Sequence, residues 1–193
     1  MVAQRLNKVL PRIISNSQFG FVKGRYIGEA IRTTYDAIDH AKEKKRAQIL
    51  LIIDSCKAFD SLSHKFIENT MKKFGFEENI LQRIIILIRD FKINIYNGGN
   101  LSMFVDLKKG CKQGDPISSC PFILGIEILS LQLKHDPGIE GMTIKNRNLL
   151  QVFFADNMSI FLNYNEESLR TTLKVLKEFY HGSGLQIQIT KKQ

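Results

Sequence analysis

The sequence lacks the features that mark several common protein classes. Its three cysteines form no CxxC pair and its four histidines show no HExxH spacing, which argues against a disulfide framework and against zinc chemistry. No apolar run is long enough to span a membrane, since residues 84–88 lie between Arg83 and Arg89. Free thiols and the lack of a secretion signal predict an intracellular protein, cytoplasmic or nuclear.

Two phosphate-binding signatures are also missing. No GxxxxGK[ST] loop occurs, and Gly182-x-Gly184 is not followed by the rest of a dinucleotide fingerprint. The sequence therefore predicts neither a P-loop enzyme nor a dinucleotide-binding fold.

Acidic residues are absent from residues 1–28, although the chain as a whole contains 19 Asp and Glu. With 28 Lys and Arg, the formal net charge is +9. Such an excess favours a polyanionic partner such as nucleic acid. A basic, acid-free start is also typical of an organelle presequence, but residues 18–25 have the composition of a part of the domain itself.

Periodicity and turn signals predict a single α+β domain over residues 1–193, with an antiparallel sheet backed by helices. Ser63, Asp115 and Asn165 are predicted to cap helices, with Pro116 as the first residue of the second. The predicted helices cover residues 27–45, 63–74, 77–90, 115–134 and 165–180. The predicted strands are 50–53 and 185–189, and the predicted hairpins pair 92–96 with 101–107 and 149–154 with 158–162.

Two carboxylates follow apolar strand runs. Asp54 comes directly after Leu50–Ile53, and Asp156 lies in the short turn of the second hairpin. A lone acid in such a place is a solvated cap or turn in about two cases of three. Two of them side by side, however, would suit a pair of Mg²⁺ ions for phosphoryl transfer. Because the two acids are far apart in the sequence, their pairing is a tertiary hypothesis.

Two further segments have compositions suited to nucleic acid. Lys109–Pro116 carries two glycines that let the backbone approach a ligand closely, and the predicted cap at Asp115 makes this loop better suited to a base pair than to a bare phosphate. Gln18–Arg25 interleaves Phe19 and Phe21 with basic residues, a pattern suited to stacking and phosphate contact. The commoner explanation for these aromatics is that they lie in the core.

In this order, the four segments resemble the reverse transcriptase domain of non-LTR retrotransposons of the long-interspersed-element type. The resemblance extends over nearly the whole chain and rests on three motifs together, Asp54–Asp60, Gln113–Pro116 and Phe154–Asp156. It implies an RNA-directed DNA polymerase with a right-hand palm and partial fingers. Residues 1–47 would be partial fingers and 48–193 mainly palm with some fingers elements, without thumb, endonuclease or RNase H region.

The resemblance also implies roles for individual residues. Asp54 and Asp156 match the catalytic ligands of two Mg²⁺ ions, with Mn²⁺ as a substitute, and Asn157 and the Ser55 backbone carbonyl are further candidate ligands. The nucleotide-binding matches are Arg25, Phe59 (beneath the sugar), Gln113, Gly114 and Lys191. The matches for template or primer contact are Phe19, Lys23, Lys112 and Pro116. The implied partners are an RNA template, a DNA primer and deoxynucleoside triphosphates, with no membrane.

The sequence departs from the family pattern at the second acid after Asp156, where it has Asn157. An amide offers a neutral oxygen but removes one negative charge from a site that must offset two dications. Other departures are Val22 where the family has Arg, Ser55-Cys56 where it has an aromatic and an acid, and Gln188 where it has Asn. The chain also stops before any thumb, which favours a truncated element copy.

Three function classes therefore stay open. The first is an RNA-directed DNA polymerase domain. The second is a catalytically impaired palm remnant that binds nucleic acid without synthesis, which Asn157 favours. The third is another two-metal enzyme on a similar palm, such as a nucleotide cyclase, and the QGDP and GF-x-x-GR segments count against it.

Overall fold

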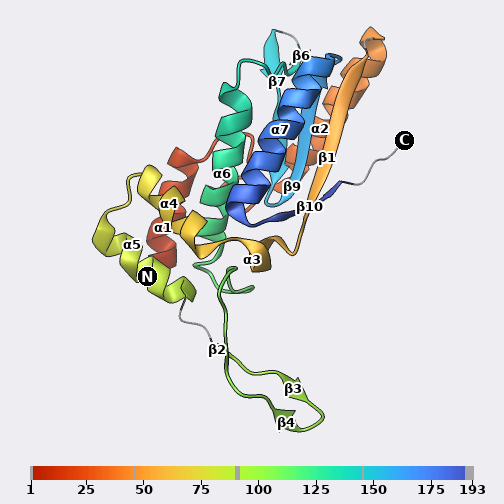
Figure 1. The fold of residues 1–193 in the computed structure, drawn as a ribbon. Helices are drawn as coiled ribbons and strands as arrows, with labels where there is room; N and C mark the ends of the chain where they lie inside the picture. The colour runs from red at the N-terminus through yellow and green to blue at the C-terminus, as the bar shows by residue number, and fades with distance from the viewer. Residues whose placement is uncertain (1, 46, 90–91, 145, 190–193) are drawn as a thin grey trace.

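A four-stranded antiparallel sheet forms the centre of the molecule in the computed structural model, which describes residues 2–45, 47–89, 92–144 and 146–189 (Figure 1). The strand order is β10-β1-β9-β8. These strands are β1 Gln48–Cys56, β8 Gln151–Phe154, β9 Asn157–Asn163 and β10 Gln186–Ile189. The predicted α+β class, the antiparallel sheet and the position of 185–189 at a sheet edge are confirmed.

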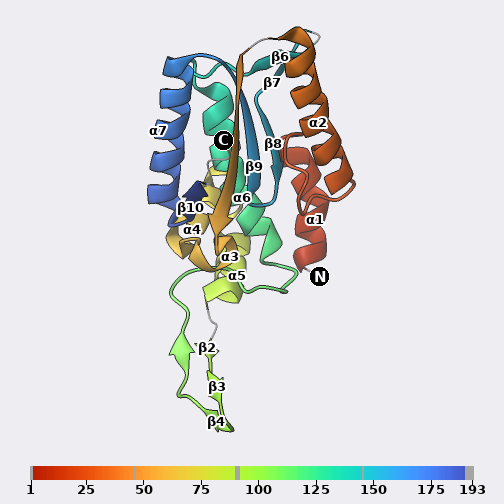
Figure 2. The ribbon, with the colours of Figure 1, turned by 90° about the vertical axis from the view of Figure 1, so that its right-hand side faces the viewer.

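Helices pack on both faces of the sheet: α2 lies against β8 on one face, and α6 and α7 lie on the other, with α1 packed against α6 (Figure 2). The helices are α1 Val2–Ile13, α2 Ile27–Lys44, α3 Ala58–Ser61, α4 His64–Lys73, α5 Glu78–Arg89, α6 Ser119–His135 and α7 Glu166–Ser183. Among these described helices, none is long and apolar enough to cross a membrane.

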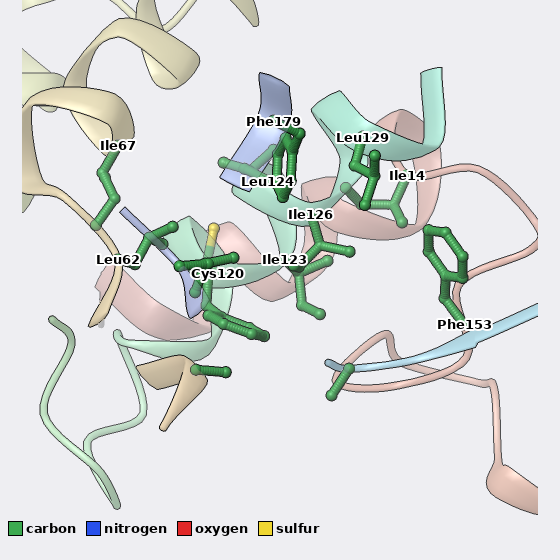
Figure 3. Packing of buried hydrophobic residues seen from close by; sticks show 14 of the residues in the cluster. Ile14, Leu62, Ile67, Cys120, Ile123, Leu124, Ile126, Leu129, Phe153 and Phe179 are labelled. Carbon is green, nitrogen blue, oxygen red and sulfur yellow. The ribbon is translucent and has the colours of Figure 1, made fainter. Parts of the chain in front are cut away.

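Strand alternation divides the core into two clusters, because successive side chains point to opposite faces. Phe153 and Ile160 pack in the large cluster with α6, whereas Val152 and Phe161 pack in a smaller one with Ala37 of α2. Figure 3 shows the large cluster, in which the buried residues of α6 lie among side chains from α1, α4, α7 and β8. A fully buried Leu, Ile or Phe contributes about 1.5–3 kcal/mol, so each of the large apolar side chains that α6 buries adds to core stability.

Local capping chemistry decides where the helices begin. Ser63 Oγ accepts a hydrogen bond from Phe66 N, and Asn165 Oδ1 accepts one from Glu167 N at 2.9 Å, so both predicted caps are confirmed. The prediction for Asp115 is wrong, because α6 begins at Ser119. Asp115 Oδ1 accepts from Ile117 N at 2.9 Å and so closes a separate turn before the helix.

Two helices and one hairpin were not expected from the sequence. Helix α1 buries Leu6 and Leu10 in the core and contains Pro11, a residue that usually ends a helix. The short helix α3 follows β1 directly, and β6 (Met142–Ile144) pairs with β7 (Arg147–Leu149). Each has weak local signals and is held by packing or pairing with elements distant in the sequence.

The predicted hairpin between residues 92 and 107 is confirmed in outline, but it is broken into two short pairs. Strands β2 (Lys92–Ile93) and β5 (Val105–Asp106) pair, as do β3 (Tyr96–Asn97) and β4 (Asn100–Leu101). The hairpin extends away from the body of the molecule (Figures 1 and 2), and the side chains of all four short strands are exposed.

Candidate active site

Asp54 and Asp156 lie at the same end of the central sheet. The pairing of β1 with β9 ends at Ile53 opposite Met158, and the β8–β9 hairpin closes with Phe154 opposite Asn157. Asp54 therefore follows the last β1–β9 pair, beside the two-residue turn Ala155–Asp156. The structure thus joins two acids that the sequence places far apart.

Two details of the predicted local structure need correction. Strand β1 does not end before Asp54 but continues to Cys56, because β10 supplies pairing partners on its other side, with Asp54 opposite Gln188. Asn157 is not part of the turn but the first residue of β9. Asp54 and Asp156 still lie beyond the last residue pair of β1 and β9, which is Ile53 with Met158.

Burial and the charge of Asp54 both act on the carboxylate of Asp156. Burial raises the pKa of the half-buried Asp156, and the negative charge of Asp54 raises it further, while the backbone N–H of Asp156 lowers it. Asp54 and Asn157 are exposed. A carboxylate whose ionised form is disfavoured by a neighbouring carboxylate is in a place where a cation would be stabilised.

A tyrosine lies behind this pair. Tyr180 of α7 is buried, and its hydroxyl lies 3.2 Å from Ser55 Oγ on β1. Burial and the charges of Asp156 and Asp54 raise the pKa of Tyr180 to about 12, so its hydroxyl stays neutral. Nothing in the sequence distinguishes Tyr180 from the other apolar positions of an amphipathic helix.

The turn that carries Asp156 is held from behind by Gln18. The Gln18 Oε1 atom accepts hydrogen bonds from Ala155 N at 2.9 Å and Gly20 N at 2.8 Å, and Gln18 Nε2 donates to Ala155 O at 3.2 Å. Gln18 is 1% exposed. Sequence reasoning singled out the aromatic and basic residues of this segment and missed the glutamine.

Phe59 and the loop Lys109–Pro116 meet just beyond β1. The Phe59 ring on α3 stacks on Phe122 with centroids 4.2 Å apart, and Cys111 N donates to Phe59 O at 2.6 Å. Gln113 Nε2 lies 3.2 Å from Asp60 Oδ1 on the same short helix. The structure therefore brings Phe59, Gln113 and the exposed Gly114 to one region, next to the end of β1.

The two buried cysteines take no part in this region's chemistry. Burial raises the pKa of both Cys111 and Cys120 to about 12, so both remain thiols, in accord with the expectation of free thiols.

Arg25 is not brought to the two acids. Its guanidinium donates to the carbonyl oxygens of Ser15 and Gln18, each at 2.6 Å, and of Ile14 at 3.0 Å. Burial lowers the pKa of Arg25, and the charges of Glu127 and Glu29 partly offset that effect. In this arrangement Arg25 ties the end of α1 to the Gln18 segment.

The other predicted contact residues occupy varied surroundings. Phe19 packs against the smaller core cluster, and Val22 is buried in the large one, which accounts for an apolar side chain at that position. The remaining template or primer candidates, Lys23, Lys112 and Pro116, are exposed. Lys191 lies outside the described residues.

Comparison with known proteins identifies the family. The family model described as Reverse transcriptase (RNA-dependent DNA polymerase) matches residues 1–193. The chain belongs to the reverse transcriptase family. The resemblance inferred from the motifs is thereby confirmed, and the domain is a member of a family of nucleotidyltransferases.

Curated relatives relate this reverse transcriptase domain to non-LTR retrotransposons. It is 27% identical over 192 residues to a Pol polyprotein from the type-1 retrotransposable element R2 of Popillia japonica, covering 99% of this chain and 26% of the relative. It is 25% identical over 205 residues to the R2DM polyprotein of Drosophila melanogaster (99% and 18%), and 23% identical over 154 residues to the Transposon TX1 149 kDa protein of Xenopus laevis (80% and 12%). The chain thus spans about a quarter or less of the length of these relatives.

Solved structures show the same fold at low sequence identity. Telomerase from Candida albicans, in complex with a fragment of telomeric RNA, matches with a TM-score of 0.71 at 13% identity, covering 99% of this chain and 34% of that one. Apo telomerase from Candida tropicalis matches with a TM-score of 0.63 at 15% identity (97% and 34%). The reverse transcriptase domain therefore has a mixed α+β fold like that of telomerase.

The reverse transcriptase family implies a divalent-metal polymerase, and the residues at the sheet end can be compared with that requirement. Among the residues that the structure describes, no group of three or more His, Cys, Asp or Glu side chains is placed to hold a metal ion. Asp54 and Asp156 are nevertheless hard oxygen donors of the kind that Mg²⁺ prefers, and burial together with the charge of Asp54 raises the pKa of Asp156. The donor set fits a cation that also takes oxygen ligands from its substrate.

A second charged group of this reverse transcriptase domain is buried away from the two acids. Glu127 of α6 is 2% exposed and accepts a hydrogen bond from Ser15 Oγ, while its Oε2 atom has no partner among the described residues. Burial raises the pKa of Glu127 above its ordinary value of 4.5, although Ser15, Arg25 and Lys134 act in the opposite direction. The ionised form is therefore disfavoured in the fold.

Glu127→Gln should stabilise the protein increasingly as the pH rises. The raised folded-state pKa means that the contribution of Glu127 to stability is fully present below 4.5 and is lost as the pH rises through the folded pKa. Glutamine keeps a neutral side chain at every pH. Urea unfolding at about pH 5 and about pH 8 should show a gain on the order of 1 kcal/mol that is larger at the higher pH. A gain that is independent of pH would contradict this assignment.

Proposed function

We propose that this domain catalyses RNA-directed DNA synthesis, adding deoxynucleoside triphosphates to a DNA primer on an RNA template by a two-metal mechanism. The observation that carries the proposal is the pairing of Asp54 and Asp156 at one end of the sheet, where the charge of one raises the pKa of the other. Membership in the reverse transcriptase family supports the choice of reaction.

In this proposal Asp54 and Asp156 are the catalytic carboxylates and hold two Mg²⁺ ions, for which Mn²⁺ can substitute. The amide oxygen of Asn157 and the backbone carbonyl of Ser55 are the further ligands. When bound, the cations would activate the primer 3′-hydroxyl and offset the charge of the leaving pyrophosphate. The contact between Ser55 and the neutral Tyr180 supports β1 from behind without adding charge to the site.

The nucleotide would lie over the region where Phe59 meets the Lys109–Pro116 loop. We propose that Phe59, fixed by its stacking on Phe122, lies beneath the sugar and disfavours a 2′-hydroxyl. Gln113 and Gly114 would contact the template and the incoming base. Lys191 and Arg25 would contact the triphosphate, which for Arg25 requires release from the carbonyl oxygens that it now binds.

Template and primer would bind mainly through their phosphates. The net charge of +9 supports this proposal, and Phe19, Lys23, Lys112 and Pro116 are the residues that we assign to it. We further propose that residues 1–47 act as partial fingers and residues 48–193 mainly as the palm of a right-hand polymerase.

A second candidate function is nucleic-acid binding without synthesis. The observation that favours it is Asn157, which lies beside the two acids in β9 and lacks the charge of a third carboxylate. Such a remnant would keep the fold and the net positive charge while holding cations too weakly for catalysis. Both candidates predict salt-dependent RNA binding, so binding alone does not separate them.

Primer extension separates the two candidates. A labelled DNA primer annealed to an RNA template should be extended by the chain in the presence of Mg²⁺ or Mn²⁺, weakly for the natural sequence and more strongly for Asn157→Asp. Extension that requires Asp156 supports the polymerase proposal. RNA binding that falls with salt, with no extension by any variant, would instead support the remnant.

A further inference from the structure

The turn that carries Asp156 has an unfavourable backbone conformation at Ala155, and its buried backbone groups form hydrogen bonds with a distant part of the chain. Ala155, the first residue of this two-residue turn, has a φ of +56°, a conformation that favours glycine and disfavours an alanine. Ala155 is also buried, so both its N–H and its C=O need partners within the protein.

The side chain of Gln18 supplies both partners. Its Oε1 accepts from Ala155 N at 2.9 Å, and its Nε2 donates to Ala155 O at 3.2 Å. The same Oε1 accepts from Gly20 N at 2.8 Å, which fixes the oxygen end of the amide toward these two N–H groups. A primary amide carries the donor and the acceptor that this arrangement needs, whereas an ionised carboxylate carries acceptors only.

The segment around Gln18 is docked against the turn by its backbone as well. Phe153 N donates to Ser17 O at 2.7 Å and Phe19 N donates to Phe153 O at 2.8 Å, so the Gln18 side chain is placed between two backbone contacts with β8. Gly20 has no room for a side chain, since an added Cβ would lie 2.3 Å from Ala155 N.

We propose that Gln18 is a positioning residue for Asp156, holding the Ala155–Asp156 turn so that the Asp156 carboxylate stays beside Asp54. The inference rests on the proposed function, in which these carboxylates share divalent cations. Gln18 itself touches neither cation nor substrate; it acts through the backbone of Ala155, the residue before Asp156.

The test compares two buried glutamines of similar burial and different neighbours. Gln18→Met removes both bonds to the turn. Gln151→Met removes a buried glutamine of β8 whose amide nitrogen donates to Ser130 O and to Ser17 Oγ, each at 3.2 Å, and makes no hydrogen bond to the Ala155–Asp156 turn among the described residues. Gln18→Glu keeps the acceptor for Ala155 N and loses the donor to Ala155 O. Near-ultraviolet circular dichroism shows which variants fold, so that Gln18→Glu carries the test if Gln18→Met does not fold.

Two measurements on the chain report the effect without relying on synthesis. Mn²⁺ affinity, measured by electron paramagnetic resonance of free Mn²⁺, should fall about tenfold in Gln18→Met, less in Gln18→Glu, and stay unchanged in Gln151→Met. Hydrogen exchange at the Ala155 amide should become at least about tenfold faster in Gln18→Met only. Both glutamine-to-methionine variants should lose stability, so unfolding alone would not reveal positioning.

The possible outcomes separate this inference from the function on which it rests. Unchanged Mn²⁺ affinity in Gln18→Met, with a clear loss in Asp156→Ala, would overturn the positioning role and leave the metal assignment intact. Equal losses in Gln18→Met and Gln151→Met would overturn it as well. If Asp156→Ala bound Mn²⁺ as tightly as the natural chain, the proposed function itself would fail.

Discussion

Replacing Asp156 by alanine should abolish primer extension, a loss of at least about a thousandfold, since losing one of two shared metal ligands removes several kcal/mol of transition-state stabilisation. Asp156→Ala should be introduced into the Asn157→Asp chain, whose rate of primer extension is expected to be high enough for a loss to be measured. The loss is expected because Asp156 is the only acid in its two-residue turn, and Asp54 lies beside that turn on β1.

A matched control for this variant is Asp39→Ala. Asp39 is an exposed carboxylate on α2 that forms an ion pair with Lys42 of the same helix, with Lys42 Nζ 3.7 Å from Asp39 Oδ1. Such a surface pair contributes about 0–1 kcal/mol, so extension should be unchanged. Extension that persists in Asp156→Ala at the control rate would show that the metal assignment is wrong.

Asn157→Asp should raise the rate of primer extension by at least about tenfold at limiting Mg²⁺, which corresponds to ~1.4 kcal/mol. Asn157 is exposed, opens β9 and lies opposite Phe154, directly after the turn that carries Asp156. A carboxylate there would add a negative charge where two dications must be offset. Asparagine offers only its neutral oxygen.

The same change should destabilise the metal-free fold, because a third carboxylate would join Asp156, whose ionised form is already disfavoured by burial and by the charge of Asp54. Added Mg²⁺ should therefore raise the thermal midpoint of Asn157→Asp more than that of the natural chain. Asn163→Asp, at the other end of β9 and opposite Gln48, provides the control and should show neither effect. An Asn157→Asp chain with no gain in extension would favour the nucleic-acid-binding remnant.

The elements with strong local signals were predictable from the sequence. Asn165 caps α7 because its short side chain reaches the N–H groups of the first turn, and the apolar runs flanking Asp156 pair as a hairpin. Asp115 showed the limit of such signals. The same carboxylate chemistry that caps a helix also closes an isolated turn, and the chain uses it for the turn.

The contacts that position the site were not predictable. Gln18 binds a turn 137 residues away, and Tyr180 reaches Ser55 across 125 residues. The residues next to Gln18 and Tyr180 in the sequence do not indicate these contacts, because folding alone brings each partner close. For Arg25 the family resemblance implies a triphosphate contact, which stays a prediction, and the sequence did not reveal that its guanidinium binds backbone carbonyl oxygens in the fold.

The most direct test of the central claim, that Asp54 and Asp156 hold the same cations, is a double-mutant cycle on Mn²⁺ affinity. Asp54→Asn, Asp156→Asn and the double variant are compared with the natural chain by electron paramagnetic resonance. If the two carboxylates share the ions, each single change should weaken binding by at least about tenfold, and the double variant should be little weaker than either. Losses that simply add, or a single change without effect, would contradict a shared site.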